Sequence, residues 1–216
     1  MAAIDTIEIL NGLDHEQDQT TSILYSIDSA TGEAVRSEAI SVPVSAKQAN
    51  VIINNTYDPD GSTVFWRVRV TKLTGVTTTA TTKTETEVTA WAELAQNAIA
   101  ETGSIDVDCH SATLHIDVAL SSTTAHTGTE VRCQIASEAG VDGSWSDLPG
   151  ARFTCLSGTA VSAALTAATE PAGETVIAIA NPVASGFDWD GKSIFIENTV
   201  AADCEIVYQV AHGADA

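Results

Sequence analysis

The chain has 216 residues, of which 44% are hydrophobic and 18% charged, a composition typical of a folded protein rather than a disordered one. Nine Lys and Arg residues stand against 29 Asp and Glu residues, which gives a net charge of −20. A chain this acidic lacks the basic surface that nucleic-acid phosphates require, and anionic membranes repel it. We therefore expect neither nucleic acid nor a membrane among its partners.

The N-terminal residues, Met1–Asp5, contain no basic region followed by an apolar one. This pattern predicts synthesis in a cytoplasm without a secretory signal peptide. No stretch approaches 18 consecutive apolar residues, so the sequence predicts no transmembrane helix.

The first predicted elements are half-buried strands, in which apolar and polar residues alternate. They span residues 22–28, 39–44 and 64–70, and a short apolar run covers residues 50–54. The turn Asp58–Gly61 separates this run from the last strand, since Pro presets φ and Gly accepts a positive φ. These elements predict a small antiparallel β domain over residues 1–73.

Residues 74–103 break this pattern. Nine of the 16 residues from Thr74 to Thr89 are Thr, which favours an extended, β-rich connector between two domains. Apolar residues then recur at helical spacing from Trp91 to Ala100, which predicts one short helix, with a strand as the alternative.

Regular alternation returns over residues 104–216 and predicts a second β domain of about seven strands. Period-2 phasing places one group of apolar side chains in a common core: Leu114, Ile116, Val118, Val131, Cys133 and Ile135. The predicted fold is all-β, with two small antiparallel sandwich or barrel-like domains and at most one short helix.

The four cysteines lie on the apolar phase of their predicted strands: Cys109, Cys133, Cys155 and Cys204. Because free Cys behaves as a small hydrophobic residue, buried free thiols are favoured. Disulfides across a sandwich remain the alternative, and a metal site is the least favoured because no C-x-x-C pair occurs.

His115 and Asp117 share the polar phase of one predicted strand. Two such side chains can bind a metal or act as a catalytic pair, but a solvated strand face is favoured. This interpretation predicts that Asp117→Asn is nearly silent.

A partial calcium loop surrounds Asp188, Asp190 and Glu197, which offer oxygen ligands at suitable spacing. Its first ligand position is Gly186, and a strand pattern runs through Ile194 and Ile196, so a plain turn is favoured. We expect no cofactor, no metal and no catalytic activity.

Trp66 lies on an apolar strand phase and is predicted to be in the core. Trp91, Trp145 and Trp189 lie beside turns or element ends and are candidate interface residues, because Trp is enriched at protein interfaces. A sugar-binding platform is the alternative.

The first part of residues 90–212 contains the segments Trp91–Ala95, Ile99–Val107, Thr113–Leu120 and Thr123–Val131. These segments resemble proteins encoded by tailed bacteriophages and related metagenomic sequences. The second part resembles a compact β motif of phage virion proteins and rests on Glu174–Ala180, the pair Gly186-Phe187, Lys192–Glu197 and Cys204–Val210. Such motifs occur in head, neck and tail proteins, and the resemblance implies a virion structural role without catalytic residues.

The expected function is therefore that of a structural subunit of a phage-like particle, a capsid decoration or accessory protein that acts through protein–protein contacts. The expected partners are the major capsid protein or other virion subunits, the expected assembly is a homo-oligomer, and the expected location is the virion. The alternatives are a self-assembling surface or filament protein, and a carbohydrate-binding module of a tail appendage.

Overall fold

The computed structural model describes residues 4–9, 19–20, 23–26, 28–29, 32–56, 63–77, 80–120, 126–138, 144–158, 162–164, 169–170, 176–180, 194–207 and 210–213. These residues form antiparallel β-strands and one 3-10 turn, η1 (Ala201–Asp203). The predicted all-β fold is confirmed.

The chain folds as two compact units that are discontinuous in sequence. Unit 1 combines residues 1–35, 119–126 and 156–216, and unit 2 combines residues 36–118 and 127–155. The predicted division into 1–73, 74–103 and 104–216 is corrected accordingly. The physical reason is that sheet partners lie far apart in sequence, which local alternation cannot reveal.

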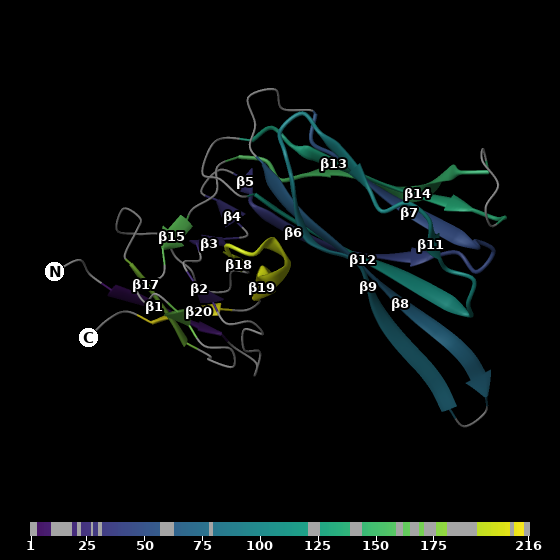
Figure 1. Cartoon of the computed structure of the whole chain (residues 1–216), viewed down its shortest axis with the longest axis horizontal. Helices are drawn as coiled ribbons and strands as arrows, with labels where there is room; N and C mark the ends of the chain where they lie inside the picture. Colours follow the sequence, from purple (N-terminus) through teal and green to yellow (C-terminus); the bar gives the residue numbers. More distant parts are fainter. Residues whose placement is uncertain are drawn as a thin grey trace. The chain divides into compact units, whose positions relative to one another are not determined.

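Unit 2 is a sandwich-like pair of sheets (Figure 1). The strands of the first sheet are, in spatial order, β6 (Val35–Val42), β12 (Ser111–Leu120), β8 (Val64–Thr77) and β9 (Ala80–Leu94). The strands of the second are β10 (Ile99–Glu101), β7 (Gln48–Asn54), β13 (Thr129–Ala136) and β14 (Ser146–Cys155), with β11 (Ile105–Asp106) also paired to β7.

The core of unit 2 lies on the alternating apolar phase of these strands. Of the six side chains predicted to share one core, five are at most 1% exposed, and Ile135 is half-buried. The exception lies beside an irregularity, because the β13–β14 register shifts between Arg132 and Gln134. Trp66 is 6% exposed, as predicted for a core residue.

The Thr-rich segment is a hairpin and not a connector. Strands β8 and β9 pair from Val64 opposite Leu94 to Thr77 opposite Ala80, with register shifts along the way. The β-branched Thr residues favour the extended backbone of such strands. The hairpin belongs entirely to unit 2.

The helix predicted over residues 91–100 is also corrected, because β9 continues to Leu94 and β10 begins at Ile99. Asn55 binds the intervening loop: its Nδ2 donates to the carbonyl of Ala95 at 3.2 Å, and its backbone N–H donates to that of Ala98 at 2.9 Å. Pairing with β8 and these tertiary bonds override a helical pattern that is less than three turns long.

Unit 1 joins N-terminal strands to C-terminal ones. One sheet has the order β17 (Val176–Ala180), β1 (Ile4–Ile9), β20 (Val210–Gly213). Another has the order β15 (Ser162–Ala164), β3 (Ile23–Ser26), β18 (Ile194–Glu197), β19 (Glu205–Val207). Two short pairs are β2 (Gln19–Thr20) with β16 (Thr169–Glu170) and β4 (Asp28–Ser29) with β5 (Gly32–Glu33).

Gly128 is predicted to tolerate no side chain. Its φ is +138°, and a methyl group there would lie 2.6 Å from Cγ2 of Thr154. Gly128→Ala combines backbone strain with a clash, so we expect a loss of about 2–3 kcal/mol in urea unfolding. Gly150→Ala is the control, because its φ is +77° but the space around it is open. Equal losses in the two variants would contradict the clash.

Candidate functional site

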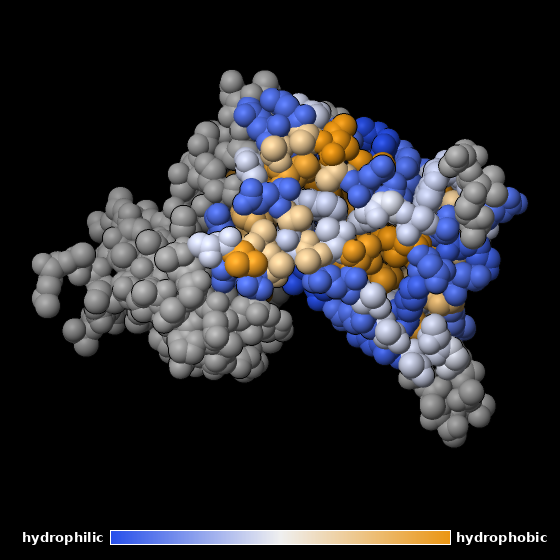
Figure 2. Space-filling model, in the orientation of Figure 1, coloured by the Kyte–Doolittle hydropathy of each residue, from blue (hydrophilic) through white to orange (hydrophobic). Residues whose placement is uncertain are grey.

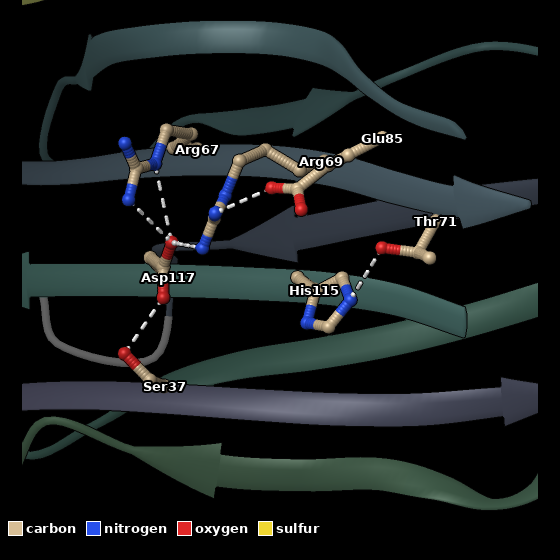
Figure 3. A network of polar contacts seen from close by, with 7 residues as sticks. All are labelled: Ser37, Arg67, Arg69, Thr71, Glu85, His115 and Asp117. Atoms are coloured by element: carbon tan, nitrogen blue, oxygen red, sulfur yellow. Dashed lines mark hydrogen bonds and ion pairs between the residues drawn. The ribbon is translucent and has the colours of Figure 1, made fainter. Parts of the chain in front are cut away.

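A buried carboxylate organises the polar phase of the first sheet of unit 2 (Figure 3). Asp117 on β12 is 2% exposed, although its neighbours Ile116 and Val118 define the apolar phase of that strand. Its Oδ1 accepts a 2.6 Å hydrogen bond from Ser37 Oγ on β6. Its Oδ2 accepts bonds from Arg67 Nε and Nη2 on β8, at 3.1 and 3.0 Å.

Arg69 extends this network toward the edge of the sheet. Its Nη2 donates to Asp117 Oδ2 at 3.3 Å, and its Nη1 donates to Glu85 Oε1 on β9 at 2.7 Å. Burial lowers the pKa of Arg69, but the charges of Asp117 and Glu85 more than offset this, so the pKa lies above its ordinary value.

Arg67 is held from a second side by an aromatic ring. Its guanidinium carbon lies 4.8 Å from the ring centroid of Trp91, which is a cation–π contact. Trp91 is 3% exposed, so it packs inside unit 2 and presents no surface for a partner. The prediction that Trp91 is an interface residue is therefore corrected. That prediction placed Trp91 at the end of an element, whereas it lies inside β9.

The network therefore connects all four strands of the sheet. Ser37 lies on β6, Asp117 on β12, the two arginines on β8, and Glu85 with Trp91 on β9. We call these residues the clasp: Ser37, Arg67, Arg69, Glu85, Trp91 and Asp117. Four donor groups surround the Asp117 carboxylate, an arrangement that stabilises its charge and fixes the strands laterally.

His115 takes a different partner. Its Nε2 lies 3.0 Å from Oγ1 of Thr71, while Asp117 binds Ser37 and the arginines. The predicted solvated face around His115 and Asp117 is thus wrong for Asp117, because β8 and β6 supply partners that the sequence of β12 does not show. The sequence signal that was missed is the pair Arg67 and Arg69 on one strand phase.

The remaining candidates do not converge on the clasp. Asp188, Asp190 and Trp189 lie outside the described residues. Glu197 ends β18 in unit 1 and stands opposite Ile23, while Trp145 is half-buried just before β14. Within the described ranges, no group of three or more His, Cys, Asp or Glu side chains is placed to hold a metal ion.

All four cysteines are among the described residues, and none forms a disulfide. Cys133, Cys155 and Cys204 are buried, in agreement with the favoured interpretation, whereas Cys109 is half-buried. Burial raises the pKa of the Cys133 thiol from 9.0 to about 12.

We predict that Cys109 reacts with iodoacetamide long before Cys133, because the thiolate is the nucleophile and burial disfavours it. Mass spectrometry after timed labelling at pH 8 reads the order directly. Stability is also expected to fall as pH rises above 9, since the unfolded thiol of Cys133 then releases a proton that the folded thiol keeps until about pH 12. Labelling of Cys133 in folded protein at the rate of Cys109 would contradict its burial.

Several of the nine Lys and Arg side chains form ion pairs within unit 2. Among its described residues, ion pairs join Arg36 to Glu38, Lys47 to Asp108, Arg67 to Asp117, Arg69 to Glu85, Lys72 to Asp106 and Arg152 to Glu130. Lys72 connects the two sheets, because it lies on β8 and Asp106 on β11. Its hydrogen bond is the main reason that the pKa of Asp106 is lowered. Because acidic residues outnumber basic ones by 20, most of them have no cation to pair with and give the chain its negative charge.

No family model, curated protein or solved structure matches the chain. Within the described residues, no helix combines the length and the apolar character that a membrane crossing needs.

Proposed function

We propose that the chain is a structural subunit of a phage-like particle, a capsid decoration or accessory protein that works through protein–protein contacts in the virion. The observation that carries the proposal is a β-hairpin that extends past its neighbouring strands while the clasp stiffens its base. The resemblance of residues 90–212 to phage virion proteins supports the same role.

The hairpin arm is the part of the β8–β9 hairpin beyond the pair Leu73–Lys83. The backbone of His110, just before β12, bonds to the carbonyl of Leu73 at 3.0 Å, so β12 accompanies β8 only to this point. The following pairs, from Thr74–Thr82 to Thr77–Ala80, join β8 and β9 to each other (Figure 1). A two-stranded ribbon that extends past its sheet can reach another subunit.

The surface of the hairpin fits contact with protein. Residues 82–87 are all exposed, and Figure 2 shows hydrophilic to neutral colours along the described part of the hairpin. Thr side chains provide hydroxyl groups without adding charge to a chain that already carries −20. The net charge of −20 suits the outside of a particle better than its DNA-facing lining.

Mass photometry with capsid shells tests this proposal. The shells are assembled from the major capsid protein of the same genome and mixed with the full chain at rising salt. We expect binding to strengthen from about 10 to about 150 mM salt, because the Debye length falls from roughly 30 to 8 Å and the repulsion between acidic surfaces weakens.

An arm-deleted variant locates the contact. Replacing residues 74–82 by Asn-Gly closes the strands with a two-residue turn next to Leu73 and Lys83. We expect this variant to keep its thermal stability and to lose binding, whereas Glu138→Lys, an exposed change in another loop, keeps both. A chain that ignores the shells at every salt concentration contradicts the proposed function.

A further inference from the structure

Strand β9 ends its sheet, because the described order is β6, β12, β8, β9. Its outer backbone groups therefore lie at a sheet edge, and the side chains of residues 82–87 are exposed. Such an edge is a template for another strand, and proteins normally protect it with charged residues. Here the charges alternate with Thr in the run Thr82, Lys83, Thr84, Glu85, Thr86 and Glu87.

We propose that the β9 edge binds the β9 edge of a second copy of this chain, antiparallel, about a two-fold axis at Thr84. In this register Lys83 stands opposite Glu85 of the second copy, and the symmetry repeats the pair. Thr82 stands opposite Thr86, and Thr84 opposite itself. Opposite charges and Thr–Thr pairs directly across strands are both stabilising. The interface is isologous and closes at two copies.

Other registers are penalised by the same charges. An axis at Glu85 pairs Lys83 with Glu87 but places the two Glu85 carboxylates directly opposite, and an axis at Lys83 places two ammonium groups opposite, whereas the axis at Thr84 sets no like charges opposite each other. A parallel, in-register pair sets every charge against its like. Like charges directly across strands are destabilising. The charges therefore favour the register with its axis at Thr84 over the other registers that keep the charged side chains on one face of the paired strands.

The clasp gives a second reason why Lys83 of a second copy would be favoured beside Glu85. Glu85 already accepts a hydrogen bond from Arg69, its side chain stays 45% exposed, and Glu87 stands opposite Arg69 in the β8–β9 register. Arg69 thus binds the carboxylates of Glu85 and Asp117 and has Glu87 as its cross-strand neighbour. Lys83 of a second copy would reduce this local negative excess.

This inference rests on the proposed structural role, and two single-charge variants test it separately. Lys83→Glu gives acidic residues at both positions, and Glu85→Lys gives basic residues at both. In each variant the two contacts across the axis become like-charged, and we expect the dimer Kd to rise roughly tenfold. Sedimentation of the full chain at high concentration measures this change.

Mixing the two variants is the decisive arm of the experiment. In the mixed pair, the two acidic side chains of the Lys83→Glu copy face the two basic side chains of the Glu85→Lys copy. Both contacts are therefore attractive, and we expect association as strong as in the wild type. Glu138→Lys is the control for a change of charge outside the edge and leaves the dimer intact. Circular dichroism and thermal unfolding check that each variant is folded, above all Glu85→Lys, which also removes the Arg69–Glu85 ion pair of the clasp.

The outcomes separate the two proposals. Wild-type dimers, weak single variants and a restored mixture support pairing at Thr84. A monomeric wild type, or a mixture no stronger than its components, overturns the self-pairing even if the chain still binds capsid shells. A restored mixture from a chain that ignores shells leaves the self-pairing in place and contradicts only the particle role.

Discussion

Replacing Ile116 by Asp is expected to unfold unit 2. Ile116 is 1% exposed at the centre of β12, with Leu114 and Val118 on the same phase. A carboxylate there has no described cation on its own phase of the strand, and its burial costs several kcal/mol. The expected loss is a large fraction of the roughly 5–15 kcal/mol that stabilises a typical domain. Urea unfolding followed by circular dichroism measures it.

Two controls keep this result specific. Ile116→Val retains the apolar phase and is expected to lose about 1 kcal/mol. Thr113→Asp introduces the same carboxylate on the opposite, half-buried phase of the same strand and is expected to be far milder. If Ile116→Asp and Thr113→Asp were equally tolerated, the register of β12 would be wrong.

Alternation was enough to predict β12 and β13 and their shared core. Where every second residue is apolar over eight or more positions, the phase alone decides which side chains are buried. The prediction was less accurate at Ile135, which is half-buried beside a register shift. Such a shift depends on β14, so nothing in the sequence of β13 marks it.

The Thr-rich segment shows what a local sequence pattern can and cannot predict. Thr favours an extended backbone, and residues 74–77 and 80–89 are extended. The composition does not show which other strand an extended segment pairs with. The β8–β9 register supplies it, and the hairpin takes the place of the predicted connector.

The clasp was beyond sequence reasoning for a similar reason. Period-2 phasing places Asp117 on the side opposite Ile116, but it does not say what covers that side. The partners Arg67 and Arg69 lie 50 and 48 residues away on β8. An available signal was the scarcity of cations: when two of only nine share one strand phase, a buried acidic partner is a reasonable expectation.

Asp117→Asn is now expected to be strongly destabilising, the opposite of the sequence-based expectation. The substitution keeps the shape but removes the charge that two guanidinium groups face. Breaking a buried ion pair costs about 3–5 kcal/mol, and because the Arg67 and Arg69 side chains remain 18% and 31% exposed, we expect about 2–3 kcal/mol. Urea unfolding at neutral pH measures the loss.

Asp108→Asn is the matched control, because Asp108 also pairs with a cation, Lys47, at 2.5 Å, but its side chain is 60% exposed. Water screens that pair, so the loss should stay below about 0.5 kcal/mol. Ser37→Ala removes one donor from Asp117 and leaves both arginines in place, which predicts an intermediate loss of about 1 kcal/mol. If Asp117→Asn cost no more than Asp108→Asn, the carboxylate would be solvated and the clasp would not hold the strands that support the hairpin arm.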